Sequence, residues 1–186
     1  MNFIEEFNID LDICDDLIVY METKGIQVPG VAGFTVDYSK KKSVDCCITD
    51  RVLLDKYIAE LTKCVNLYSE KYQYVCTSPW AVKEYVNIQK YKPGDAFYKW
   101  HCERNGGGND VINKRFLVFM TYLNDVTDGG ETEFYHQNVK FQPKKGRTLI
   151  WPVDWTHTPR RIPSMTQTTY IVTGWISFTN QPTANQ

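Results

Sequence analysis

The sequence predicts a mostly β protein with N-terminal helices and a double-stranded β-helix (jelly-roll) core. Residues 1–80 carry apolar side chains mainly at helical spacing. The rest of the chain alternates short strand-like runs with turn residues, and 14% of all residues are aromatic. Helices followed by many short strands are typical of helices packed on a double sheet.

Length and charge limit the classes of protein that need to be considered. At 186 residues we expect one domain, with a helical support region over 1–80 and the jelly-roll core over 81–180. The net charge of −1 gives no electrostatic reason to expect nucleic acid or an anionic membrane as a partner. No apolar run approaches about 18 residues, so we expect no transmembrane helix.

The N-terminus and the cysteines indicate a cellular setting. The first residues are acidic and lack a basic region, so no secretory signal is visible. We therefore expect a cytoplasmic protein whose six cysteines are reduced thiols.

Two amphipathic helices are expected before the strands. Residues 10–22 place Leu17 and Met21 among apolar residues at helical spacing, and Gly25 follows as a stop. Residues 50–72 repeat the pattern, with Asp50 as the N-cap. A polar loop over 28–43 connects the two helices.

The second part of the chain contains the predicted strands. Alternation indicates a strand over 84–91, and continuous apolarity over 115–123 indicates a strand buried on both faces. Gly129 and Gly130 form a turn before a predicted hairpin. The other expected strands are 97–101, 132–135, 139–141, 147–151 and 168–178, with a flexible loop over 105–109 and a frayed tail over 181–186.

Two of the three histidines stand where a mononuclear iron site needs them. His101 and Glu103 are two residues apart, so on a strand their side chains share one face. His157 follows later in the chain. A His-x-acid pair with a distal histidine is the pattern of the 2-His-1-carboxylate triad that binds Fe(II) and leaves positions open. His136, at the tip of the predicted hairpin, is expected at the surface.

Five segments in order resemble the prolyl 4-hydroxylase-like dioxygenases that depend on Fe(II) and 2-oxoglutarate. Segment 91–103, Tyr-Lys-Pro-Gly-Asp-Ala-Phe-Tyr-Lys-Trp-His-Cys-Glu, resembles the first iron-ligand segment of the family. The other four are 115–126 with its Tyr-Leu-Asn, the Gly-Gly-Glu-Thr turn at 129–132, the strand 143–152, and the closing strand 170–175. The helical start, with Lys-Ser-Val-Asp at 42–45, is similar to small phage and bacterial members.

The resemblance implies a role for individual residues. It implies Fe(II), 2-oxoglutarate and O2 as cofactor and cosubstrates, and a peptide, protein or small molecule as substrate. The implied iron ligands are His101, Glu103 and His157. The implied 2-oxoglutarate contacts are Tyr91, Tyr122, Thr173 and Trp175. The implied substrate contacts are Tyr98, Trp100 and Arg115.

One departure concerns the cation that holds the 2-oxoglutarate tail. Where the family has Arg or Lys before the closing-strand aromatic, this chain has Thr169, which offers only a hydroxyl. A buried carboxylate needs a cation, so we expect Arg160 or Arg161 to fold in and meet it.

We therefore predict hydroxylation of a peptidyl substrate, with proline as the favoured residue, in the host cytoplasm if the chain is phage-encoded. The carboxylate at Glu103 favours hydroxylation over halogenation. Two alternatives stay open: a cupin-like metal oxidase that does not use 2-oxoglutarate, and a jelly-roll binding module without catalysis.

Overall fold

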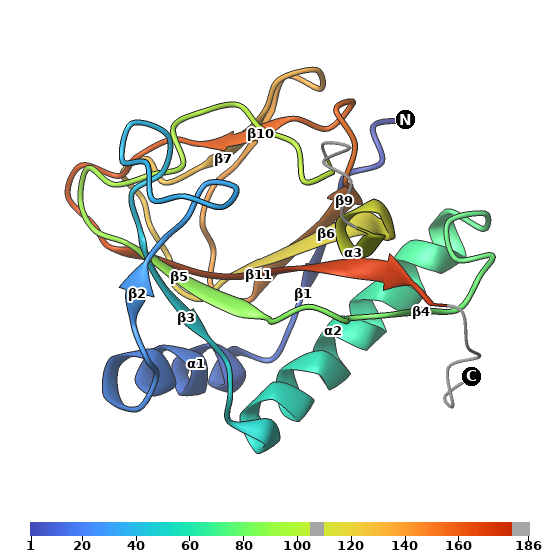
Figure 1. The fold of residues 1–186 in the computed structure, drawn as a ribbon, viewed down its shortest axis with the longest axis horizontal. Coiled ribbons are helices and arrows are strands. Elements are labelled where there is room, and N and C mark those ends of the chain that lie inside the picture. The colour runs from blue at the N-terminus through green and yellow to red at the C-terminus, as the bar shows by residue number, and fades with distance from the viewer. Residues whose placement is uncertain (105–109, 180–186) are drawn as a thin grey trace.

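The computed structural model describes residues 1–104 and 110–179, and two antiparallel sheets face each other in it (Figure 1). The strands of the larger sheet are β1 (Glu5–Asn8), β2 (Val28–Pro29), β3 (Val44–Cys47), β4 (Trp80–Ala81), β5 (Asn87–Tyr91), β6 (Arg115–Tyr122), β9 (Arg147–Pro152) and β11 (Thr169–Phe178). They run in the order β1-β9-β6-β11-β5-β3-β2, with β4 paired to β11. The smaller sheet has the order β10-β7-β8, with β7 (Thr132–Phe134), β8 (Val139–Phe141) and β10 (Pro159–Arg161). The predicted jelly roll is confirmed.

The helices cover the face of the larger sheet that points away from the smaller one (Figure 1). They are α1 (Leu11–Thr23) and α2 (Arg51–Lys71), and a short α3 (Asp110–Asn113) precedes β6. Asp10 caps α1 through the Asp12 amide at 2.9 Å, and Asp50 caps α2 through the Leu53 amide at 3.1 Å. Both predicted helices are thus confirmed. In the described part of the chain, no helix has the length and apolarity to cross a membrane.

Strand β6 separates two hydrophobic cores. Leu117 and Phe119 point to the core beneath the helices, whereas Val118, Met120 and Tyr122 point to the core between the sheets. All eight residues of β6 are buried. This explains why its sequence is continuously apolar, because a strand covered on both faces has no solvent side.

Closing strand β11 lies against β6 at a point where a side chain would not fit. A Cβ built on Gly174 would lie 2.5 Å from Cζ of Phe119. Phe119 is fully buried and faces α2 through Tyr57, at 6.2 Å between ring centroids. The glycine therefore lets β11 approach β6 over a large aromatic ring.

Several short elements differ from expectation. The strand predicted over 97–101 is wrong: only Phe97 forms a bridge, to Lys41, because the backbone of this segment bonds to a loop and to β10 instead of to one strand. The region expected to be helical contributes β1, β2 and β3 to the larger sheet. Strands of two to four residues carry too little alternation to be recognised. The predicted loop 105–109 and tail 181–186 lie outside the described residues.

Gly174→Ala is expected to destabilise the fold by about 1–3 kcal/mol, the usual cost of an overpacked core. Urea unfolding followed by tryptophan fluorescence measures this loss. Phe119→Leu in the same chain shortens the opposing side chain and should recover part of it, so the two substitutions should not be additive. Equal stability of Gly174→Ala and the original protein would contradict the close approach.

Candidate active site

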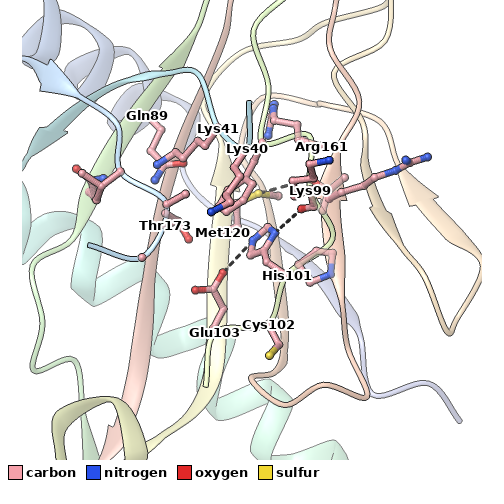
Figure 2. Close-up of a pocket in the computed structure, with 18 of the residues that line it drawn as sticks. Lys40, Lys41, Gln89, Lys99, His101, Cys102, Glu103, Met120, Arg161 and Thr173 are labelled. Carbon is pink, nitrogen blue, oxygen red and sulfur yellow. Dashed lines mark hydrogen bonds and ion pairs between the residues drawn. The ribbon is translucent and has the colours of Figure 1, made fainter. Parts of the chain in front are cut away.

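A cavity of about 540 Å³ lies between the two sheets. Its floor comes from the larger sheet, with Gln89, Met120 and Thr173 among the lining residues (Figure 2). Its other side comes from β10 and from the segment that carries His101 and Glu103. The segment predicted to hold the first two iron ligands therefore faces a cavity of ligand size.

His101 and Glu103 converge in this cavity, with 3.3 Å between Nε2 and Oε1 (Figure 2). His101 Nδ1 lies 3.0 Å from the Lys99 carbonyl oxygen, which can only accept, so Nδ1 carries the proton. In the neutral ring, Nε2 then presents a lone pair to a carboxylate oxygen. Such a contact is favourable only with a proton or a cation between the two atoms. The pair therefore has the chemistry of two metal ligands.

Packing holds both side chains of the pair. The Phe97 ring stacks on the His101 ring at 3.7 Å and 6°. Trp175 Nε1 donates to Glu103 Oε2 at 3.1 Å, which leaves Oε1 facing the histidine. Outer hydrogen bonds of this kind orient metal ligands.

Glu103 is ionised in this setting. Burial raises the pKa of its carboxyl group, but a proton on His101 Nε2, the charge of Arg115 and the Trp175 hydrogen bond outweigh burial, and the pKa lies below its usual value. A cation between the neutral His101 ring and Glu103 would take the place of that proton. Arg115 stacks on Trp175 at 3.6 Å and donates to the Glu103 carbonyl oxygen at 2.9 Å. Its Nε also donates to Glu84 at 2.7 Å. These bonds make Arg115 a support of the pair, and its predicted substrate contact stays a prediction.

His157 does not join the pair. It is 5% exposed and does not line the cavity. Its Nε2 donates to the Asn2 carbonyl oxygen at 2.8 Å, and its Nδ1 lies 2.9 Å from the Thr156 hydroxyl. Within residues 1–104 and 110–179, no three His, Cys, Asp or Glu side chains gather as a metal site. The structure thus brings together two of the three predicted ligands. The third, His157, is instead hydrogen-bonded to the N-terminal segment through the Asn2 carbonyl oxygen.

Arg161 is the buried cation of the cavity. It is 5% exposed, and its guanidinium carbon lies 4.7 Å from the Tyr91 ring centroid and 5.5 Å from that of Tyr122. Its Nη2 is buried without a hydrogen-bond partner among the described residues. A buried unsatisfied charged donor is costly, so this position favours an anionic ligand.

The two tyrosines already have protein partners. Tyr91 donates to Gln89 Oε1 at 2.7 Å, and the Tyr122 hydroxyl lies 2.7 Å from Thr132 Oγ1. Burial raises the pKa of both hydroxyl groups, so they are neutral donors. The guanidinium of Arg161 lies over both rings. Thr169 is buried beside Tyr91 in the β11–β5 ladder and is not part of the lining. Of the two, Arg161 and not Thr169 lines the cavity.

The remaining predicted residues divide between lining and rim. Thr173 and Trp175 line the cavity. Arg160 donates to Glu133 at 2.8 Å and lies over Trp100 at 4.3 Å, so it is paired at the rim. Tyr98 donates to the Gly94 carbonyl oxygen at 2.8 Å and does not line the cavity. His136 is exposed, as predicted.

Sequence reasoning missed a polar cluster in the cavity wall. Lys41 and Asp45 form a buried ion pair at 2.8 Å, and Ser43 donates to the same carboxylate at 2.6 Å. Asn87 and Gln89 add amide donors at 3.0 and 3.5 Å. The only signal in the sequence is the four-residue spacing of Lys41 and Asp45 inside a polar loop, which is indistinguishable from a surface pair.

The lining is electropositive. It contains six basic residues (Lys40, Lys41, Lys99, Arg115, Arg160 and Arg161) and two acidic ones (Asp45 and Glu103). Lys41 is paired with Asp45, and Lys40, Arg115 and Arg160 are paired with acids outside the lining, so the excess of positive charge comes from Lys99 and Arg161. This excess attracts an anionic ligand.

Comparison with known proteins identifies the family of the core. The model of the 2OG-Fe(II) oxygenase superfamily matches residues 86–177. A search of the curated proteins finds no match. The core of this chain, from the end of the helical region to the closing strand, belongs to the 2OG-Fe(II) oxygenase superfamily. Its chemistry is therefore that of an oxygenase that uses Fe(II) and 2-oxoglutarate.

Solved structures share the fold across the chain. The viral collagen prolyl hydroxylase of Paramecium Bursaria Chlorella virus-1, in complex with 2-oxoglutarate, has a TM-score of 0.73 at 21% identity, covering 95% of this chain and 97% of that one. The Pseudomonas putida prolyl-4-hydroxylase has a TM-score of 0.72 at 16% identity, covering 95% and 94%. A Trichoplax adhaerens prolyl hydroxylase, in complex with a hypoxia inducible factor peptide fragment, has a TM-score of 0.74 at 16% identity, covering 96% and 84%.

Trp175→Phe is expected to weaken metal binding about 10–100-fold, as loss of an outer partner of a ligand usually does. The substitution keeps an aromatic ring over Arg115 but removes the donor to Glu103 Oε2. Calorimetric titration with Co(II) under argon measures the affinity. Trp155→Phe is the matched control, because Trp155 is 69% exposed. Equal affinity in both variants would mean that Trp175 does not orient the carboxylate.

Proposed function

We propose that this protein is an Fe(II)- and 2-oxoglutarate-dependent dioxygenase that hydroxylates a prolyl residue of a peptide. One observation carries the proposal. A single cavity contains both the facing His101–Glu103 pair and Arg161, whose Nη2 is buried without a hydrogen-bond partner among the described residues. The first is a place for a hard cation, and the second is a place for a carboxylate.

The residues of the cavity fit 2-oxoglutarate. This cosubstrate has two carboxylates, and Arg161 Nη2 lacks a partner that one of them would supply. The rings of Tyr91 and Tyr122, over which the guanidinium lies, help to hold it in place. We propose Arg161 as the cation that replaces the missing Arg or Lys at Thr169.

The donor set also fits Fe(II). His101 Nε2 and Glu103 Oε1 would hold the metal, which with 2-oxoglutarate and O2 supplies the oxidising chemistry. Phe97 and Trp175 keep these two donors oriented. Apolar side chains such as Met120, Trp151 and Ile171 line the same space and limit access of water to it.

The mouth of the cavity suits an extended peptide. Val31 and Phe34 line the cavity and are 46% and 85% exposed, and Trp100 lies on the opposite segment. Phe34 therefore presents an exposed aromatic ring, which packs well on a proline ring, whereas Trp100 is half-buried under Arg160. The similar structures from the virus, Pseudomonas and Trichoplax are prolyl hydroxylases, and the last is bound to a peptide fragment. These observations support a peptidyl proline substrate.

The two alternatives are disfavoured. The cupin-like oxidase was supported by the absence of a basic residue at Thr169, and Arg161 now supplies a buried cation. A binding module without catalysis does not account for the family match. The cytoplasmic setting, in a host cell if the chain is phage-encoded, is part of the proposal, and the six free cysteines are consistent with it.

Arg161→Gln is expected to weaken 2-oxoglutarate binding about 10–100-fold, because a hydrogen bond to a charged group is worth about 1.5–3 kcal/mol. Titration of the metal-loaded protein with 2-oxoglutarate measures this. Arg160→Gln is the matched control, since Arg160 is paired with Glu133 at the rim. Stronger loss in Arg160→Gln than in Arg161→Gln would contradict the assignment.

The protein is expected to form succinate from 2-oxoglutarate and to add one oxygen atom to proline in a proline-rich peptide. Mass spectrometry of the peptide and succinate measurement test both products. A peptide with alanine in place of proline is the control. Succinate formation with oxidation of some other substrate would leave the oxygenase chemistry intact and remove the prolyl assignment. Absence of succinate with every substrate would contradict the proposed function itself.

A further inference from the structure

His157, the third predicted iron ligand, lies outside the cavity that contains His101 and Glu103. We infer that this chain presents two protein ligands to the metal, His101 and Glu103, and that Pro159 stands where a third would reach it. The inference rests on the proposed function for the identity of the metal. It concerns which residues of this chain bind it, and it is tested by metal binding rather than by turnover.

Backbone hydrogen bonds fix what lies next to the pair. The His101 amide donates to the Pro159 carbonyl oxygen at 3.1 Å, and the Glu103 amide donates to the Val153 carbonyl oxygen at 3.2 Å. Segment 101–103 is therefore held between Val153 and Pro159. The residues between these two points form a loop that leaves the pair.

His157 lies in that loop and is held away from the cavity. Its amide donates to the Asp154 carbonyl oxygen at 2.8 Å, which closes a turn. Its ring nitrogens contact Asn2 and Thr156, and the Phe3 ring meets its edge at 6.4 Å. Burial lowers the pKa of the ring, so it is a neutral side chain with satisfied partners. A structural role accounts for every polar contact of this histidine.

Pro159 occupies the facing position instead. On β10, all three residues contribute to the cavity lining, but Pro159 and Arg161 are buried, whereas Arg160 between them is half-buried and turns to Glu133 at the rim. This is the alternation of a strand. The strand therefore directs residue 159 and residue 161 to the same space, one beside His101 and the other over the rings of the tyrosines. Proline carries no donor atom in its side chain, so it contributes no ligand.

The consequence is that protein side chains fill fewer coordination positions of the metal than in a three-ligand site. Fewer protein ligands leave more positions to water or to cosubstrate oxygen atoms. Metal binding should then depend strongly on 2-oxoglutarate, and by linkage 2-oxoglutarate binding should depend equally on the metal. A histidine at position 159 should make the metal less dependent on the cosubstrate.

The experiment titrates Co(II) into the full chain, with and without 2-oxoglutarate, and counts coordinated imidazoles by pulsed electron paramagnetic resonance on Mn(II). We expect one imidazole in the original protein and two in Pro159→His. We expect Pro159→His to tighten Co(II) binding by about tenfold or more, since even an outer partner of a ligand contributes about 10–100-fold. Pro159→Ala controls for the loss of the proline ring.

Variants of the two native histidines decide between the positions. His101→Ala should abolish binding, whereas His157→Gln should leave it unchanged, because glutamine can still donate to the Asn2 carbonyl oxygen. Phe3→Ala loosens the same packing without changing a histidine and controls for stability. Two imidazoles in the original protein, loss of metal in His157→Gln but not in Phe3→Ala, or no gain in Pro159→His over Pro159→Ala would each overturn the inference.

Failure of the proposed function looks different. If the original protein binds no metal but Pro159→His does, position 159 is correctly identified and the iron-dependent activity is not. If His101→Ala abolishes Co(II) binding as expected but no peptide is oxidised, the ligand assignment stands and only the substrate or the reaction is wrong.

Discussion

The pairing of β10 on both of its edges is the constraint on which the site depends. One edge joins β7 in the smaller sheet, and the other joins the segment that carries His101, through the Pro159 carbonyl and the Arg161 amide. A three-residue strand held in this way cannot rotate or slip without losing both sets of bonds. Strand β10 therefore fixes the position of Pro159 beside His101 and the position of Arg161 over the rings of Tyr91 and Tyr122.

Electrostatics then divides the cavity into two places. The His101–Glu103 pair is two acceptors that need a cation between them, and Arg161 is a cation that needs an anion. The Lys41–Asp45 pair beside them is already satisfied by its own hydrogen bonds. Buried charges are costly unless they are paired. The His101–Glu103 pair and Arg161 therefore indicate where ligands bind, whereas the Lys41–Asp45 pair is a structural part of the cavity wall.

The two arginines and the two candidate histidines show how much small displacements matter. Arg160 and Arg161 are neighbours, yet strand alternation sends one to Glu133 at the rim and the other into the cavity. His157 is two residues from Pro159, and a turn closed on Asp154 carries it to the N-terminal segment. Residue type and approximate spacing are the same for a ligand and for a structural histidine.

The sequence by itself determined the jelly-roll class, both long helices with their caps, the doubly buried β6 and the His101–Glu103 pair, because each depends on periodicity or spacing within one short segment. Only the tertiary structure decided the short strands, the position of Arg161 in the cavity lining and the position of His157 outside it. These depend on pairing between segments far apart in the chain, such as β10 with 97–101 and His157 with Asn2. Local patterns carry no information about which distant backbone supplies the partner.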